Sequence, residues 1–243
     1  MADFYETLAA VYDDVFPLSP AQVAFVRGKL PPAPCRIIDL GCSTGALART
    51  LSADGYDVWG VDLSERMIAV AQSAPVADHS SHVTFSVADM RDAVTYARDV
   101  GALLCLGNTL VHLHDQQDLS AFLQRCQRAL RTAGVMIAQI VNYDRVLDQK
   151  IQQLPTLAGK QGNRLDRSYR ERDDGLIDFV TRLSTSTGSA LDSEVRLYPL
   201  RRSELQHLLT RAGFHEVTFY GSYQGEEWSK ETFHTICVAQ RVE

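Results

Sequence analysis

The sequence has no hydrophobic run long enough to cross a bilayer and no excess of positive charge, and we expect no signal peptide from its first residues. A membrane-spanning helix needs about 20 predominantly apolar residues. The first residues, Met-Ala-Asp-Phe-Tyr-Glu, contain no basic segment followed by an apolar one. The net charge of −6 argues against a general binder of nucleic acid or anionic membranes. We therefore expect a cytoplasmic protein that binds neither membranes nor, in general, nucleic acid.

Paired cysteines are also missing. The five cysteines are scattered, odd in number and without any Cys-x-x-Cys pair; they are Cys35, Cys42, Cys105, Cys126 and Cys237. This pattern fits a reduced compartment better than a disulfide or zinc framework. The sequence has no clustered set of metal ligands either, so we predict no metal site. Cys42 lies in a turn of interest below, where packing is a more common role for a cysteine than nucleophilic attack.

What the sequence does contain is the composition of an ordinary globular protein. Of 243 residues, 45% are apolar and 22% are charged, which is enough for a full core. A length of this order allows one or two domains. Because no internal stretch reads as a long linker, we predict a single domain over residues 1–243, as a monomer or homodimer.

The segment 36–45 organises the rest of the chain. Ile37 and Ile38 are typical of a buried parallel strand, and Gly41 and Gly45 mark a turn before a segment with helical spacing at 46–51. Glycines let the backbone approach a ligand, and the first N–H groups of a helix offer hydrogen-bond donors. The pattern predicts a binding turn between a strand and a helix.

This turn lacks the glycines of a dinucleotide-binding pattern. Counted from Gly41, that pattern needs glycines at positions 43 and 46, where the chain has Ser43 and Ala46. Asp39 precedes the turn, and Asp62 follows about 20 residues later, at the end of the next predicted strand. A carboxylate there can accept hydrogen bonds from both ribose hydroxyls. The spacing favours a nucleoside over a pyrophosphate.

The segment Asp39-Leu-Gly-Cys-Ser-Thr-Gly45 resembles motif I of the class I S-adenosylmethionine-dependent methyltransferases. The usual form has glycine where this chain has Ser43, which narrows the space beside the methionine part of the cofactor. Asp62-Leu-Ser-x-x-Met67 is similar to motif II of the family. The resemblance implies S-adenosylmethionine as cofactor, with Asp62 on the ribose and Leu63 and Met67 packed on the adenine. Asp39, Gly41, Cys42 and Gly45 would form the turn around the cofactor.

Two further segments extend the resemblance. After the predicted strand 82–89, Asp89 would accept from the adenine amino group, and Met90 would offer its backbone N–H. Leu-Gly-Asn-Thr-Leu-Val-His-Leu, at 106–113, looks like that of small-molecule enzymes similar to glycine N-methyltransferase. The strand end at Leu106 would then lie beside the cofactor. Asn108 and His112 are candidates to touch the acceptor, although His112 could equally be a packed helix histidine.

The N-terminal segment carries a pattern, Tyr-x-x-Leu-Ala-x-x-Tyr-Asp, that resembles the lid of many small-molecule methyltransferases. Residues 4–16 are predicted to form one short amphipathic helix within a lid over residues 1–30. By the resemblance, Tyr5 and Tyr12 cover the cofactor and border the acceptor, and Tyr12 is also a catalytic candidate. Plain core packing is the competing interpretation for both tyrosines.

The remaining pattern predicts an α/β fold: a Rossmann-like seven-stranded sheet with helices on both faces. A fourth strand is expected in 102–110, a helix over 118–130 closed by Ala133-Gly134, and a fifth strand at 135–141. Strands at 217–220 and 232–239 would follow a helix at 202–212, with the last one antiparallel. Residues 144–198 read as an antiparallel insertion, with strands at 164–172, 175–184 and 190–198. The resemblance implies that this insertion covers the substrate.

The resemblance implies transfer of a methyl group to a nitrogen or oxygen of a small-molecule acceptor. Three other interpretations remain open at this stage. They are an RNA-modifying methyltransferase, which the acidic charge disfavours, a cofactor-binding protein with a regulatory rather than catalytic role, and an NAD-dependent oxidoreductase. Ser43, Ala46 and the antiparallel end of the sheet count against the last.

Overall fold

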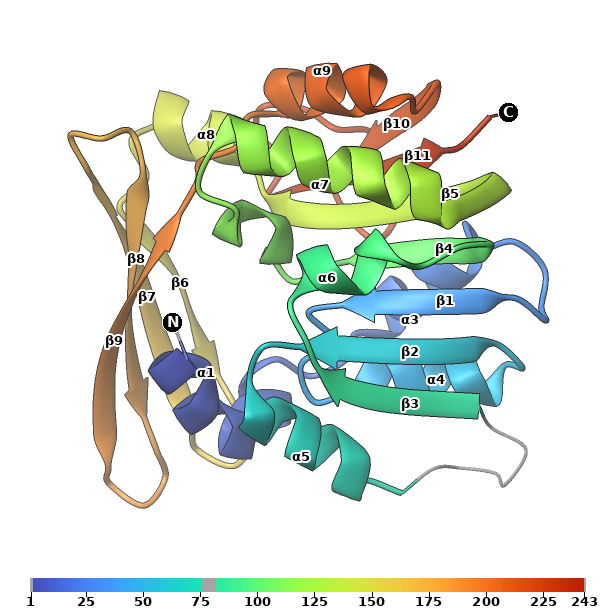
Figure 1. Cartoon of the computed structure of the whole chain (residues 1–243). Helices are drawn as coiled ribbons and strands as arrows, with labels where there is room; N and C mark the ends of the chain where they lie inside the picture. Colours follow the sequence, from blue (N-terminus) through green and yellow to red (C-terminus); the bar gives the residue numbers. More distant parts are fainter. Residues whose placement is uncertain (1, 76–81, 243) are drawn as a thin grey trace.

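A seven-stranded mixed sheet forms the centre of the computed structural model, which describes residues 2–75 and 82–242 (Figure 1). Its order is β10-β11-β5-β4-β1-β2-β3, with β11 antiparallel to both neighbours and all other pairs parallel. The strands are β1 (Arg36–Leu40), β2 (Asp57–Asp62), β3 (His82–Val87), β4 (Val100–Cys105), β5 (Leu130–Val141), β10 (Glu216–Tyr220) and β11 (His234–Gln240). The predicted fold class and the antiparallel last strand are confirmed.

Helices bury both faces of this sheet, which explains the continuous apolar runs of its central strands. Ile37 and Leu104 pack in a cluster with α3 (Pro20–Arg27) and α4 (Ala46–Ala53). Their neighbours Ile38 and Leu103 belong to a second cluster with α6 (Met90–Thr95), α7 (Gln116–Ala129) and α9 (Arg202–Ala212). The remaining long helix, α5 (Glu65–Ser73), packs on β2 and β3. No helix within the described residues is long and apolar enough to span a membrane.

The insertion after β5 forms a separate four-stranded antiparallel sheet, preceded by α8 (Tyr143–Asp148). Its strands, in spatial order, are β6 (Gln153–Ala158), β7 (Arg164–Glu171), β8 (Ile177–Ser184) and β9 (Ala190–Leu197). The prediction of three strands was wrong because β6 was missed. This strand contains Pro155 and lies at the sheet edge, where a residue without a backbone donor is tolerated. Figure 1 shows the small sheet beyond the carboxyl ends of the parallel strands.

The N-terminal segment lies between the two sheets (Figure 1). It forms three short pieces, α1 (Ala2–Leu8), the 3-10 turn η1 (Ala9–Val11) and α2 (Tyr12–Val15), rather than the one helix predicted over 4–16. Leu8, Ala9 and Val15 are buried. The pieces α1 and η1 contact α5, which packs on the seven-stranded sheet, and α2 contacts β6 of the insertion. The break therefore lets one short segment contact both α5 and the small sheet.

Two boundaries around the centre of the sheet differ from the prediction. Ala133 and Gly134 do not close a helix: α7 ends at Ala129, and β5 already starts at Leu130. A Cβ on Gly134 would lie 3.0 Å from the Val100 carbonyl oxygen, so glycine permits a close approach where the β4–β5 register is irregular. The predicted fourth strand is also shorter, because β4 ends at Cys105. Its exit continues through a turn into the 3-10 helix η2 (Thr109–His112).

Candidate active site

A cavity of about 460 Å³ opens at the carboxyl ends of the parallel strands, the edge where open α/β sheets bind ligands. Most of the predicted site residues line it: Tyr5, Tyr12, Gly41, Asp62, Leu63, Met67, Asp89, Met90, Leu106 and His112. Four predicted residues are not part of its wall: Asp39, Cys42, Gly45 and Asn108. The structure thus brings together segments from the N-terminal lid, the first three strands and the β4 exit.

The turn after β1 has no room for side chains at its two glycines. Both glycines have a φ of +74°, in the left-handed region. A Cβ on Gly41 would lie 2.6 Å from the Thr109 hydroxyl oxygen, and one on Gly45 would lie 2.5 Å from the Phe85 ring. Ser43 is also left-handed, with a φ of 48°. The turn keeps its glycine-like conformation at the position where serine replaces the family's glycine.

Asp62 joins the turn to the start of α5. One carboxylate oxygen accepts from the backbone N–H of Ser43 and the other from that of Ser64, each at 3.0 Å. Burial raises the pKa of Asp62, and these backbone donors oppose the rise. The Ser64 hydroxyl in turn accepts from Met67 N–H and caps α5. The turn after β1 and the start of α5 therefore both hold the Asp62 carboxylate in place at the cavity wall.

Asp39 and Cys42 lie behind the turn rather than in the cavity. Asp39 is 4% exposed; burial and the nearby charge of Asp62 raise its pKa to about 7. The Cys42 side chain is buried, and burial raises the pKa of its thiol well above the usual value. A protonated buried thiol is not a nucleophile. Their placement favours support of the turn over direct contact with a ligand.

The wall formed by β2, β3 and their exits is largely apolar. Leu63 is 59% exposed although it is a large apolar side chain, and Met67 and Met90 line the same cavity. Asp89 caps α6 and forms a close ion pair with Arg91, with one N–O distance of 2.6 Å. This partner holds the pKa of Asp89 below its usual value. The sequence prediction for Asp89 did not include Arg91, whose guanidinium pairs with the carboxylate two positions earlier in the chain.

His112 and Tyr5 form a pair on the cavity wall. The Tyr5 hydroxyl and His112 Nε2 are 3.1 Å apart, and the two rings meet edge to face. The other ring nitrogen, Nδ1, is buried and has no hydrogen-bond partner within the described part of the chain. Burial lowers the pKa of His112 to about 4, so this imidazole is neutral at pH 7.

Asn108 is placed next to the cavity with its side chain turned away. Its oxygen accepts from Val141 N–H at 2.9 Å, and its amide nitrogen donates to the Tyr143 hydroxyl at 3.1 Å. The backbone is left-handed, with a φ of 67°, which asparagine tolerates better than most residues. Asn108 therefore ties the β4 exit to the end of β5, beside Gly107 on the cavity wall.

The N-terminal segment is held down by polar contacts that sequence reasoning missed. The Thr44 hydroxyl donates to Asp13 at 2.5 Å, and the Ser64 hydroxyl donates to Glu6 at 2.6 Å. Ser43 lies close enough to Tyr12 to lower its pKa against the larger effect of burial, which raises it. Acidic residues at an N-terminus give no local signal for such partners, since each lies more than 30 positions away in the chain. The lid is thus closed over the turn and over α5.

Other residues of the site were also absent from the prediction. Thr109 fills the space opposite Gly41, and Gly107, Leu113 and His114 line the cavity. All of these follow β4, so the strand end itself was the available signal. The Tyr223 hydroxyl, on the β10–β11 connection, is buried without a partner among the described residues. Among all residues that the structure describes, no group of three or more His, Cys, Asp or Glu is arranged to hold a metal ion.

Known proteins similar to this chain are methyltransferases. Residues 37–134 match the family described as methyltransferase domain. A glycine/sarcosine N-methyltransferase from Aphanothece halophytica is 28% identical over 201 residues, which cover 82% of this chain and 71% of that enzyme. A glycine/sarcosine/dimethylglycine N-methyltransferase from Actinopolyspora halophila is 29% identical over 84% of this chain, but this region spans only 36% of that protein.

Solved structures extend the similarity to the whole fold. An S-adenosylmethionine-dependent methyltransferase from Clostridium acetobutylicum superposes with a TM-score of 0.80 at 17% identity, covering 99% of this chain and all of its own. A sugar N-methyltransferase from Streptoalloteichus gives a TM-score of 0.69 at 21% identity, covering 96% and 92%. Together with the strand order and the glycine turn, these matches identify the chain as a class I S-adenosylmethionine-dependent methyltransferase, with S-adenosylmethionine as its methyl donor.

Proposed function

We propose that this methyltransferase acts on a small molecule and that its acceptor atom is the nitrogen of an amine, with an oxygen acceptor as the second choice. The observation that carries the proposal is the neutral His112, a residue of the cavity wall whose buried Nδ1 has no partner in the described structure. The names of the relatives point the same way, since they include glycine/sarcosine and sugar N-methyltransferases.

The residues on the wall fit S-adenosylmethionine. We assign the ribose hydroxyls to Asp62 and the adenine ring to the apolar surface of Leu63, Met67 and Met90. The exposed leucine supports this assignment, because a large apolar side chain that is 59% exposed at a cavity has surface to cover. Gly41 leaves the backbone open to the ligand, and Tyr5 and Tyr12 close the site from the lid side.

Bound S-adenosylmethionine supplies a methyl group already activated by its sulfonium, so the protein has mainly to position the acceptor and exclude water. An amine must be neutral to attack, and it carries an extra proton after transfer. In the tautomer in which His112 Nε2–H donates to Tyr5, Nδ1 has a free lone pair. That lone pair can accept a hydrogen bond from the neutral amine and orient it for attack, and the extra proton leaves with the product in its ammonium form. Tyr5 then fixes the ring orientation.

Asn108 has a positioning role in this proposal. Its side-chain amide is used by Val141 and Tyr143, so it holds the β4 exit and η2 in place rather than touching the acceptor. Leu106 and Gly107, which precede it, form the part of the wall nearest to this support. Asp89, with Arg91 on its carboxylate, is assigned to the adenine end.

The test is transfer of radiolabelled methyl groups from S-adenosylmethionine to glycine, sarcosine and an amino sugar. We expect one of these amines to be methylated, and His112→Gln to lower kcat at least about tenfold. The affinity of the His112→Gln variant for S-adenosylhomocysteine should stay within about twofold of that of the unmodified protein. His207→Gln, on the exposed side of α9, is the matched control and should keep full activity.

Other outcomes would contradict the proposal. Methylation of RNA but of no small acceptor would establish the nucleic-acid alternative. Tight binding of S-adenosylhomocysteine without transfer to any acceptor class would favour a regulatory protein. Full activity of His112→Gln would show that the histidine has no role in the reaction. Only the part of the proposal that concerns the class of substrate would then stand.

A further inference from the structure

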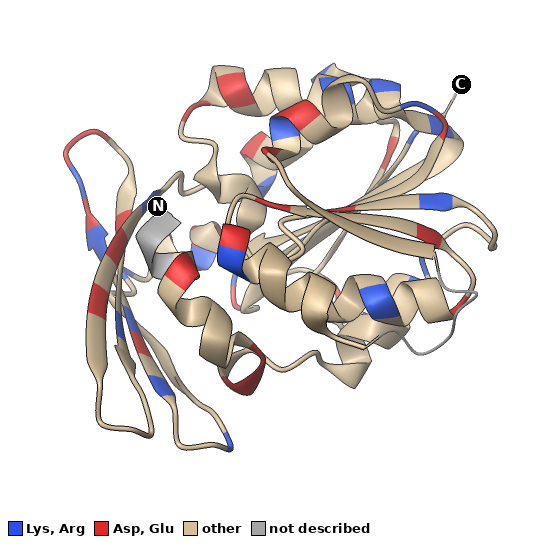
Figure 2. Ribbon diagram, turned by 60° about the horizontal axis from the view of Figure 1, so that its bottom comes forward, with Lys and Arg blue, Asp and Glu red and all other residues tan. Residues whose placement is uncertain are grey.

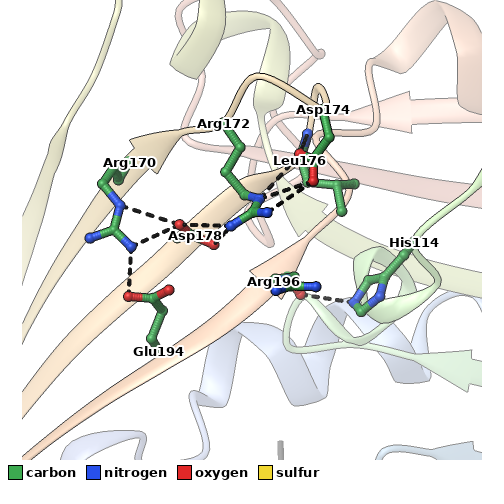
Figure 3. A network of polar contacts seen from close by, with 8 residues as sticks. All are labelled: His114, Arg170, Arg172, Asp174, Leu176, Asp178, Glu194 and Arg196. Atoms are coloured by element: carbon green, nitrogen blue, oxygen red, sulfur yellow. Dashed lines mark hydrogen bonds and ion pairs between the residues drawn. The ribbon is translucent and has the colours of Figure 1, made fainter.

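Several carboxylates of the insertion form ion pairs with arginines of the same small sheet. Figure 2 shows acidic and basic residues side by side along these strands. Figure 3 shows Asp178, which is 1% exposed, between Arg170 and Arg172. Near the β8–β9 turn, Asp192 pairs with Arg182. These ion pairs join residues of the insertion to one another.

Asp14, in α2 of the lid, binds to the insertion through neutral donors. One carboxylate oxygen accepts from the backbone N–H of Gln161 at 3.0 Å, and the other accepts from the side-chain amide of Asn163 at 2.8 Å. A Cβ on Gly159 would overlap with this carboxylate. Burial raises the pKa of Asp14, but the hydrogen bonds from the turn hold it below its usual value. The β6–β7 turn, residues 159–163, is therefore shaped to bind an ionised carboxylate of the lid.

Asn163 connects this turn to the neighbouring turn of the small sheet. Its side chain is buried, and its amide oxygen accepts from the backbone N–H of Ser186 at 3.1 Å. Ser186 belongs to the β8–β9 turn, residues 185–189. The Asn163 carbonyl oxygen also accepts from Gly159 N–H at 2.7 Å, which closes the first turn. Through Asn163, the Asp14 carboxylate is therefore linked to both turns at this end of the sheet.

The opposite end of the small sheet is attached to the β4 exit. Directly after β9, the Tyr198 N–H donates to the Val111 carbonyl oxygen of η2 at 2.8 Å. His114 Nε2, on the cavity wall, lies 3.0 Å from the Arg196 carbonyl oxygen (Figure 3). The strands β7 and β8 have eight residues each, so the two ends of the sheet are about 25 Å apart. The insertion is thus held by η2 at one end and by Asp14 at the other.

The segment that carries Asp14 also forms part of the cofactor site. Tyr5 and Tyr12 line the cavity. Asp13, the neighbour of Asp14, accepts from the hydroxyl of Thr44 in the turn after β1. A cofactor that contacts Tyr12 and this turn therefore stabilises the same short stretch of chain that binds the insertion.

We propose that Asp14 is a positioning residue that couples the insertion to the cofactor site. Binding of S-adenosylmethionine or S-adenosylhomocysteine fixes α2 on the turn after β1, and Asp14 then fixes the two turns of the small sheet. A ligand that binds one conformation better shifts the population toward it. Because Asp13 and Asp14 are consecutive, the two contacts form and break together. The inference does not depend on which acceptor atom is methylated.

The test is amide hydrogen exchange, followed by mass spectrometry, on the full chain with and without saturating S-adenosylhomocysteine. In the unmodified protein, we expect the ligand to slow exchange in the lid, residues 5–16, and in the turns 159–163 and 185–189. The slowing in the turns should be about fivefold or more, the lower range of coupling between two sites. Asp14→Asn keeps the shape of the side chain but turns an amide N–H toward the donors of the turn. In this variant the ligand should still slow exchange in the lid and should change exchange in the turns less than about twofold.

Asp192→Asn is the matched control, since this exposed carboxylate lies near the same end of the small sheet and pairs with Arg182. Its turns should respond to the ligand as those of the unmodified protein do. The proposal is overturned if the ligand leaves exchange in the turns of the unmodified protein unchanged, or slows it equally in Asp14→Asn. Exchange that rises by the same factor with and without the ligand in Asp14→Asn would also overturn it, because Asp14 would then only stabilise the fold. No acceptor is present, so failure here would not count against the proposed reaction, and failure of amine methylation would not count against Asp14.

Discussion

At the scale of single residues, the site depends on side chains whose partners are backbone groups. Asp62 illustrates this, because both of its oxygens are held by N–H groups from segments 21 positions apart, Ser43 and Ser64. The position of Asp62 at the end of a strand was predictable from spacing alone. The orientation of Asp89 was not, since its pairing with Arg91 depends on how a side chain folds at the start of a short helix.

Replacing Asp62 with alanine should weaken binding of S-adenosylhomocysteine by about 10- to 100-fold, the usual effect of losing hydrogen bonds to a charged group. The reason is that the ribose hydroxyls lose their acceptor and the turn at Ser43 loses its support. Calorimetric titration measures the effect. Asp57→Ala, an exposed carboxylate at the other end of the same strand, is the control and should bind normally. Equal affinity in Asp62→Ala would show that the ribose assignment is wrong.

His112 leads to a prediction about the pH dependence of the reaction. Because burial lowers its pKa to about 4, His112 does not change charge between about pH 5.5 and 8. The rate should therefore follow ionisation of the acceptor amine and rise as the amine loses its proton. Rate profiles for two amines of different basicity should shift with the amine. A rise centred near the ordinary histidine pKa of about 6.5 for both amines would mean that His112 titrates with an unperturbed value.

At the scale of elements, the parallel strands were predictable and the accessory elements only in part. Strands buried on both faces have continuous apolar sequences, as β4 does, and a short run of this kind between turn signals is typical of a central strand. The strand β6 has no such signal: Gln153, Pro155 and Thr156 break any alternation, and the strand exists because β7 supplies its partner. The three pieces of the lid were read as one helix for a similar reason, since the first two pieces contact α5 and the third contacts β6, and the local sequence does not show these partners.

The lid should open more easily when Thr44 loses its hydroxyl. Thr44 is 1% exposed and donates to Asp13 in α2, so Thr44→Val leaves this carboxylate without its buried donor. We expect faster hydrogen exchange in residues 5–16 and a several-fold faster release of S-adenosylhomocysteine. Deletion of one hydrogen bond to a charged group costs roughly 1.5–3 kcal/mol. Exchange mass spectrometry and stopped-flow dissociation give the two measurements.

The control for this experiment is Thr50→Val in the neighbouring helix. The Thr50 hydroxyl donates to the Ala46 carbonyl of its own helix. This substitution should leave exchange in the lid unchanged. If Thr44→Val also leaves exchange and release unchanged, the Asp13 contact does not hold the lid, and the contacts of Glu6 and Tyr12 are sufficient.

At the scale of the whole molecule, buried ionisable groups set how stability depends on pH. His234 lies in β11, with its Nδ1 3.1 Å from the side-chain nitrogen of Gln139, and burial lowers its pKa from 6.5 to about 4. A group with a depressed histidine pKa stays neutral in the folded protein while the unfolded chain takes up a proton. Its contribution to stability is therefore present above about pH 6.5 and is lost as the pH falls toward 4.

Asp39 affects the pH dependence of stability in the opposite direction. Burial raises its pKa from 3.8 to about 7, so the folded protein holds a proton that the unfolded chain has released. Its contribution is present below about pH 3.8 and is lost as the pH rises toward 7. The stability of the whole chain therefore depends on pH through His234, Asp39 and His112 together. Replacing one of these residues by a group that does not titrate isolates its contribution.

His234→Asn should isolate the contribution of the histidine. In the unmodified protein, His234 alone should lower the free energy of unfolding by about 2 kcal/mol between about pH 7 and pH 5. The variant should lack this loss, whatever its absolute stability, because asparagine does not titrate. Urea denaturation at the two pH values measures the difference. The exposed His215, changed to asparagine in the same way, should leave the pH dependence as it was. If His234→Asn and His215→Asn lose equal stability between the two pH values, the imidazole of His234 is not buried as a neutral group, and the packing of β11 against β5 is looser than the register implies.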